Sequence, residues 1–327
     1  MSATEIDASI AALERDTSYV GGEVTPDSVT DSTRRRHHAA AGTVELLERI
    51  MADNRAIRSE LEAERRAIGE FVAYLDGKTP TDEPTAWGSG VRTLVGYAPG
   101  KASTAVSERS IDAWLKQTHQ RLSGRVEKSR QRIEPFQAQA QALASGAEGL
   151  REAARQAGSN RQVALGATRR ALALGSGETV VRSAVRHGRM AEVFAVLEHG
   201  FRRSAAALDD LRGGLFELVE RTQQHEQGAV EPLGSARDAV LAVSWDDSTP
   251  AAQRRETVRT ALSGIDALVE RSAGYVGDAQ LLARQQLHCW SQANNAIVAE
   301  LEQLSAQRVA PFAGDGLKAA RQLIDAT

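Results

Sequence analysis

Mainly apolar residues recur in alternating steps of three and four over more than thirty consecutive residues of the chain. Residues spaced in this way lie on one face of an α-helix. The pattern therefore predicts a single long helix over residues 178–227 with a continuous buried seam. The seam positions are Met190, Phe194, Leu197, Phe201, Ser204, Leu208, Leu211, Leu215, Leu218, Thr222 and His225.

Three further stretches, residues 26–76, 103–157 and 249–309, carry the same spacing over similar lengths. Long helices with compact connections favour an up-and-down arrangement. The predicted fold is all-α: an elongated antiparallel bundle of four long helices, with short helices at the turns and termini. The seams include a few polar residues, among them Thr43, Asn54, Ser204, Ser272 and Gln286. Polar seam positions such as Asn54 and Gln286 can set the register between helices.

Glycine, proline and capping residues divide the chain into five segments. These are a short N-terminal helix and loop (1–27), a first long hairpin (28–157), a connecting short helix (158–177), a second long hairpin with a short helix in its turn (178–309), and a tail helix (310–327). Ser2 and Glu5 predict a capping box at the first helix, and Gly158-Ser159-Asn160 predicts a turn. An alternative organisation is two successive hairpins that touch only in part.

Composition favours a globular protein without a membrane span. The chain is 42% hydrophobic and 25% charged, with a formal net charge of -3 that argues against a general nucleic-acid binder. The single cysteine, Cys289, excludes an intrachain disulfide. No stretch reaches the ~20 apolar residues of a spanning helix, and the N-terminus lacks the pattern of a signal peptide. We expect a cytoplasmic protein, with a peripheral membrane location as the alternative.

The sequence contains no catalytic or cofactor-binding motif that predicts an enzyme. Residues 96–103 have a Gly-Lys pair but lack the preceding glycine and the following Ser or Thr of a phosphate-binding loop. None of the seven histidines stands in the Glu-x-x-His arrangement of a helical metal site. His119 and His225 fall on seams and are interpreted as interhelical polar contacts. We therefore predict no catalytic, cofactor-binding or metal-binding residues.

His288 and Cys289 suggest a catalytic dyad only because they are adjacent in the linear sequence. Neighbours on a helix point about 100° apart, so these two side chains cannot share a proton. Cys289 is interpreted instead as a small packing residue beside Trp290.

One region has a marked excess of positive charge. Residues 161–189 contain six arginines and a single acid, Glu178. The same region includes an apolar segment over 163–174. This combination would suit docking on an anionic membrane surface. In the competing interpretation, the apolar side packs on the bundle and the arginines pair with acids on neighbouring helices. The arginines are Arg161, Arg169, Arg170, Arg182, Arg186 and Arg189. A second basic run, 34–38, is interpreted as a solvated surface.

These features favour a non-enzymatic helical scaffold or protein-interaction protein. Its expected partner is another protein or a second copy of the chain. The alternative is a membrane-associating helical-bundle protein that docks through residues 161–189.

Overall fold

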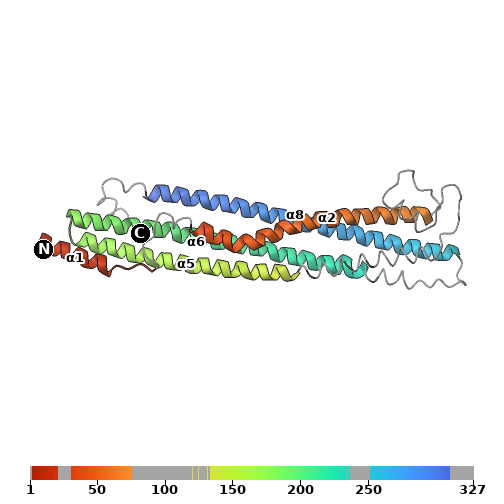
Figure 1. Cartoon of the computed structure of the whole chain (residues 1–327), viewed down its shortest axis with the longest axis horizontal. Coiled ribbons are helices and arrows are strands. Elements are labelled where there is room, and N and C mark those ends of the chain that lie inside the picture. Colours follow the sequence, from red (N-terminus) through yellow and green to blue (C-terminus); the bar gives the residue numbers. More distant parts are fainter. Residues whose placement is uncertain are drawn as a thin grey trace. The chain divides into compact units, whose positions relative to one another are not determined.

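The computed structural model describes residues 2–20, 31–75, 120, 124, 131, 133–233, 235 and 251–309. Every regular element in these residues is a helix, which confirms the all-α prediction (Figure 1). The elements are α1 (Ala3–Asp16), α2 (Asp31–Leu75), α5 (Ile133–Ala173), α6 (Glu178–His225), the π-helix η2 (Glu226–Val230), which continues α6, and α8 (Ala251–Val309).

The predicted start of the third long helix is confirmed, because α6 begins at Glu178. The predicted end of the fourth helix near Val309 stays a prediction, because residues 310–327 lie outside the described residues. At α1 the capping box is present: the Ser2 hydroxyl accepts from the Glu5 backbone N–H at 3.3 Å, and the Glu5 carboxylate accepts from the Ser2 N–H at 2.7 Å. Two of the donors that a helix start leaves without partners are thereby satisfied.

The turn predicted at residues 158–160 is wrong, because α5 continues through it to Ala173. Gly158 lies against Glu198, and a Cβ atom there would come within 3.3 Å of that carboxylate. The Asn160 amide is buried and makes two hydrogen bonds to the backbone of Val20, at 3.0 and 2.9 Å. These residues serve contacts across the fold and do not end a helix. The separate connecting helix of residues 158–177 is therefore the end of α5, and the chain turns at 174–177, where Gly175 has φ 134°.

The helices contribute to two compact units. The described part of unit 1 comprises residues 2–20, 31–45, 139–213 and 286–309, and that of unit 2 comprises 46–75, 133–138, 214–233 and 251–285. The single elongated bundle expected for the whole chain stays a prediction. The expected features of residues 76–119, 236–250 and 310–327 lie outside the described residues.

In unit 1, α5 and α6 form an antiparallel hairpin. Arg151 contacts Asp209, and Arg161 lies 3.9 Å from Glu198, so later residues of α5 face earlier residues of α6. The α6 seam is buried as predicted, with Phe194, Leu208 and Leu211 among its core residues.

α1 packs across the end of this hairpin (Figure 1). Its buried residues Ile10 and Leu13 form a cluster with α5 and α6 residues Ala167, Ala171, Val180 and Ala184. Leu172 and Leu174 pack against the same cluster. Much of the apolar surface of segment 163–174 is thus covered by α1.

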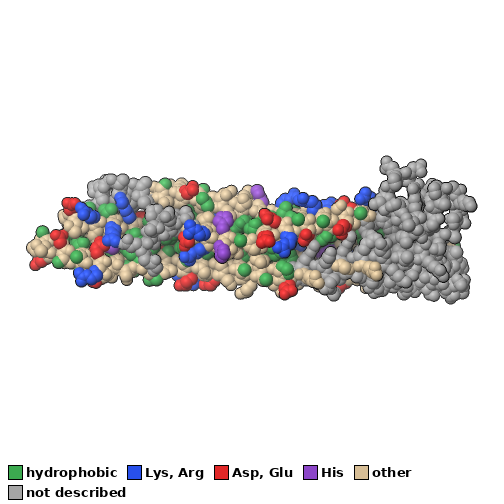
Figure 2. All heavy atoms as spheres, in the orientation of Figure 1, with side chains coloured by type: hydrophobic (Ala, Val, Ile, Leu, Met, Phe, Trp, Pro, Cys, Tyr) green, Lys and Arg blue, Asp and Glu red, His purple; other side chains and the backbone are tan. Residues whose placement is uncertain are grey.

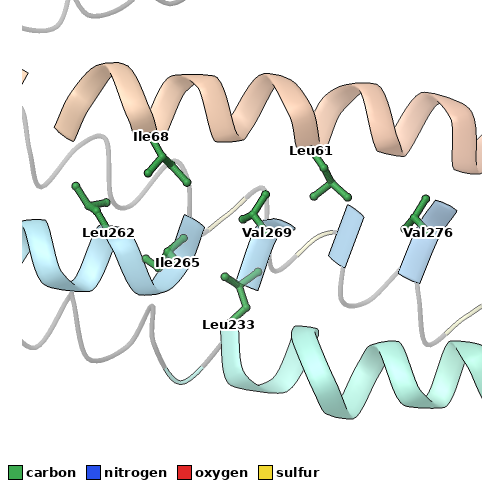
Figure 3. Close-up of a cluster of buried hydrophobic side chains, with 7 residues drawn as sticks. All are labelled: Leu61, Ile68, Leu233, Leu262, Ile265, Val269 and Val276. Carbon is green, nitrogen blue, oxygen red and sulfur yellow. The ribbon is translucent and has the colours of Figure 1, made fainter. Parts of the chain in front are cut away.

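In unit 2, α2 and α8 run antiparallel and share a core (Figure 3). Arg65 pairs with Asp266 on α8, whereas the earlier residue Arg58 lies beside the later Gly277. Side chains from α2, α8 and the segment after η2 meet between them. The buried cluster is Leu61, Ile68, Leu233, Leu262, Ile265, Val269 and Val276.

Candidate interaction groove

An open groove of about 690 Å³ runs along the surface of unit 2 between α2 and α8. Arg58, Glu62 and Arg65 form its α2 edge, since steps of four and three residues place them on one helix face. These residues flank the buried Leu61, so the packing of α2 on the core fixes the edge. The α8 side consists of Glu270, Ala273, Gly274, Gly277, Asp278, Gln280, Leu281 and Arg284.

Small residues leave the α8 backbone accessible on its side of the groove. Gly274 has no atom within 4 Å of an added Cβ, and at Gly277 the nearest such atom is a guanidinium nitrogen of Arg58 at 3.6 Å. Helix backbones approach most closely where both lack side chains. A helix laid on this side could therefore come near the α8 backbone.

Leu281 supplies an apolar contact at the same place. It follows Gly277 by four residues and is 53% exposed, one of three large hydrophobic residues exposed in the described part of the chain. A single exposed leucine is ordinary. One beside two glycines in a groove has the geometry of an anchor for a partner side chain.

The rim is charged but balanced. Arg65 lies 3.2 Å from both Asp266 and Glu270, and its hydrogen bond to Asp266 raises the pKa of the guanidinium. Arg58 pairs with Glu62 at 3.0 Å. Exposed pairs of this kind contribute little to stability. They can select a partner through charge complementarity.

A second space lies in unit 2, beside His225. It measures about 30 Å³ and is lined by Tyr275, by apolar residues and by the polar residues Asn54, Arg221, Thr222 and His225. A volume of this size holds about one water molecule. It fits a buried hydration site better than a ligand site.

The π-helix η2 adjoins this space, and its geometry has a local cause. A Cβ atom on Gly228 would lie 2.7 Å from the hydroxyl of Tyr275. The guanidinium of Arg271 donates to the Gly228 carbonyl at 3.1 Å. π-turns are often found at functional positions. Here the turn admits the Tyr275 ring against the backbone.

The six arginines predicted as an anionic-surface contact have different surroundings. Arg182 pairs with Glu178 at 2.6 Å, and Arg186 pairs with Glu14 of α1 at 2.6 Å. Arg161 lies near Glu198. Arg189 is exposed and also contacts another residue. Arg169 and Arg170 are exposed on α5. Figure 2 shows basic and acidic side chains interspersed along the face in view.

Two sequence interpretations need correction. Cys289 is exposed, while its neighbour Trp290 is buried. Adjacent helical residues point about 100° apart, so the seam tryptophan turns the cysteine outward. The basic run 34–38 is not a uniform solvated surface, because Arg36 is fully buried.

Other candidate residues lie partly beyond what the structure describes. His119 and residues 96–103 fall outside the described ranges. Among the described side chains, no group of three or more His, Cys, Asp or Glu could hold a metal ion. The described helices also include none that is apolar over the length needed to cross a bilayer.

Sequence reasoning missed the groove, although a signal for it exists. Gly274, Gly277 and Leu281 follow one another on a single face of the predicted fourth helix, next to the seam. Glycines in a helix interior carry a cost of about 1 kcal/mol each relative to alanine, and their presence often has a packing reason.

Comparisons with protein-family models, with curated proteins and with solved structures find no match for the chain.

Proposed function

We propose that this protein is a non-enzymatic helical scaffold that binds another protein through the α2–α8 groove of unit 2. The observation that carries the proposal is the pairing of Gly274 and Gly277 with the exposed Leu281 inside one open groove. In helix-in-groove recognition, an amphipathic helix lays its apolar face in a groove and is held by anchor residues spaced three and four apart.

The occupant expected in the groove is an amphipathic helix. The groove follows the α8 face over residues 270–284, which is about four turns. A partner helix would place a small or apolar residue against Gly277 and a larger one against Leu281. Charged residues on its flanks would meet Arg58 and Glu62 on one side, and Asp278 and Arg284 on the other.

Site-specific photocrosslinking in the cells that produce the protein tests this proposal. A photoreactive residue at position 281 of the full chain should cross-link to one discrete partner. The matched control is position 285, where Gln285 is also exposed on α8 but does not line the groove. A product made of two copies of this chain would identify self-association.

The substitution Leu281→Asp should then weaken binding of that partner at least tenfold, since it removes the anchor and adds a charge. Gln285→Asp adds the same charge and should leave binding within about twofold. Equal cross-linking at positions 281 and 285, or equal effects of the two substitutions, would contradict the proposal.

Membrane association is the second candidate, and Arg169 and Arg170 favour it because both are exposed on one helix. Burial of the neighbouring apolar segment beneath α1 weighs against it. Co-sedimentation with anionic and neutral liposomes distinguishes the two functions. Salt-sensitive binding to anionic vesicles that is lost in an Arg169→Gln, Arg170→Gln double variant would favour the membrane.

A further inference from the structure

A fully buried arginine lies in unit 1 without an acidic partner among the described residues. Arg36 of α2 is 0% exposed, and its one hydrogen bond there runs from Nη1 to the hydroxyl of Ser204 at 3.1 Å. Burial lowers the pKa of Arg36 to about 10, and no carboxylate of the described residues counteracts this effect. The guanidinium therefore remains protonated at neutral pH. A buried charge is normally paired, because removing an ion from water is costly.

The unpaired atoms of Arg36 lie on one edge of the guanidinium. Nε and Nη2 have no hydrogen-bond partner within the described chain, whereas Nη1 does. The Nε–H and an Nη2–H bond point in parallel, and this edge binds the two oxygens of a carboxylate or phosphate group. The unused edge of Arg36 thus has the donor spacing for an oxyanion.

Two buried hydroxyl groups lie close to Arg36, one at Nη1 and the other one helical turn earlier on α2. Ser32 lies one helical turn before Arg36, is fully buried, and its Oγ has no partner among the described residues. Ser204 is also fully buried, and while its oxygen accepts from Arg36, its own proton is available to a second acceptor. Gly200 brings the α6 backbone close to Ser32, since a Cβ there would lie 3.0 Å from the Ser32 Oγ and 2.9 Å from Cδ2 of Leu301.

The neighbouring arginines show that the lack of an acid is specific to Arg36. Asp31 lies 3.8 Å from Arg34 and 2.8 Å from Arg35, and both of those arginines are exposed. The carboxylate of Asp31 thus pairs with the exposed arginines of the run, and the described part of the chain supplies no counter-charge to the buried one.

We propose that Ser32, Arg36 and Ser204 form a buried anion site that takes an oxyanion group, a carboxylate or a phosphate. The guanidinium edge supplies two charge-assisted hydrogen bonds, and the hydroxyl groups supply further donors. The site lies in unit 1 and is independent of the groove in unit 2.

Thermal unfolding of the full chain at constant pH and ionic strength tests the site. Chloride is replaced stepwise by inorganic phosphate in one series and by acetate in a second, which separates the two oxyanion sources. A ligand that binds only the folded state should raise Tm in a saturable way, by roughly 2–5 °C at 100 times its Kd. Phosphate and acetate that stabilise the wild type no more than chloride would overturn the proposal.

Arg36→Met removes the charge and keeps much of the side-chain volume, and such replacements are often neutral or stabilising. This variant should lose the saturable increase in Tm. Arg35→Met, at the exposed neighbour, is the matched control and should retain it. An equal phosphate response in the two variants would contradict the site and assign the stabilisation to general salt effects.

Ser32→Ala provides a second test that leaves all charges in place. It should raise the Kd for the stabilising anion about tenfold, because a hydrogen bond to a charged group is lost. Stability without the anion should stay equal or increase, since a buried hydroxyl without a partner is removed. An unchanged Kd would exclude Ser32 from the site.

Discussion

The Nε2 atom of His225 lies 2.6 Å from the hydroxyl oxygen of Ser272, joining α6 to α8 within unit 2. Both residues occupy seam positions where a leucine would pack without any polar partner. The pair confirms the interpretation of His225 as an interhelical polar contact. Such a contact disfavours other registers of the two helices, because a shift would leave both groups buried and unpaired.

Replacing Leu211 with Asp should destabilise the protein by several kcal/mol. Leu211 is 3% exposed in the core of unit 1, so the substitution places a charge where no partner exists. The exposed neighbour Asp210 is the control, and Asp210→Ala should change stability by about 0.5 kcal/mol or less. Chemical denaturation of both variants measures the difference, and a wild-type midpoint for Leu211→Asp would show that the α6 seam is assigned wrongly.

Stability should fall as the pH drops below about 6.5, with His187 as one cause. His187 is 3% exposed, accepts or donates a 2.7 Å hydrogen bond with Tyr19, and has Nε2 3.3 Å from Glu14. Burial lowers its pKa, and although Glu14 acts to raise it, the net shift is downward. The unfolded chain therefore binds the proton more readily, so acid favours unfolding.

The free energy of unfolding, measured by urea titration between pH 5 and 7.5, checks this effect. His187→Gln should fall less steeply with decreasing pH than the wild type. His288→Gln is the control, because His288 is exposed on α8. If the His187→Gln curve ran parallel to the wild-type curve, the histidine would not be the titrating group.

Gly228→Ala should destabilise unit 2 by about 1–3 kcal/mol through overpacking. The added methyl group would meet the Tyr275 hydroxyl, which lies 2.7 Å from the Cβ position. Adding Tyr275→Phe should recover part of this loss. Gly264→Ala is the matched control, since Gly264 has no atom within 4 Å of an added Cβ and lies in α8. It should stabilise the helix by up to about 1 kcal/mol.

Cys289 and Trp290 should respond in opposite ways to substitution. Cys289→Ser should leave the melting temperature unchanged, and the exposed thiol of the folded wild type should react readily with a thiol reagent. Trp290→Ala should cost about 3–5 kcal/mol, because the ring is buried. Thiol labelling that required unfolding would show that Cys289 is covered in solution.

Periodicity predicted the parts of the fold that depend on local burial. A seam position is buried whenever the seam of its helix faces the core. Thr43, Asn54, Ser204 and Ser272 are buried as expected. Gly158 and Asn160 were misread because both residue types are common in turns. Their partners, Glu198 and Val20, are distant in the sequence, so no local pattern could reveal them.

The candidate sites depended on tertiary contacts in the same way. Arg36 looks like its exposed neighbours in the sequence, and only packing against α6 distinguishes it. Arg186 belongs to the basic region 161–189 in the sequence, yet its charge is matched by Glu14 of α1. The groove is formed by α8 together with the edge of α2. The α8 glycines could therefore not be assigned to it from the sequence alone.

The π-helix at residues 226–230 has a consequence for changes in chain length. In an α-helix, deleting one residue rotates every later side chain by about 100° and misplaces the seam. A π-turn already contains one residue more than an α-turn, and the inward-facing positions around it, the half-buried His225 and the buried Ala229 and Leu233, follow two successive steps of four. A single deletion within this segment would convert the turn to α-helical geometry. Unit 2 thus has one place where evolution or design can shorten a core helix by a residue with little disturbance beyond it.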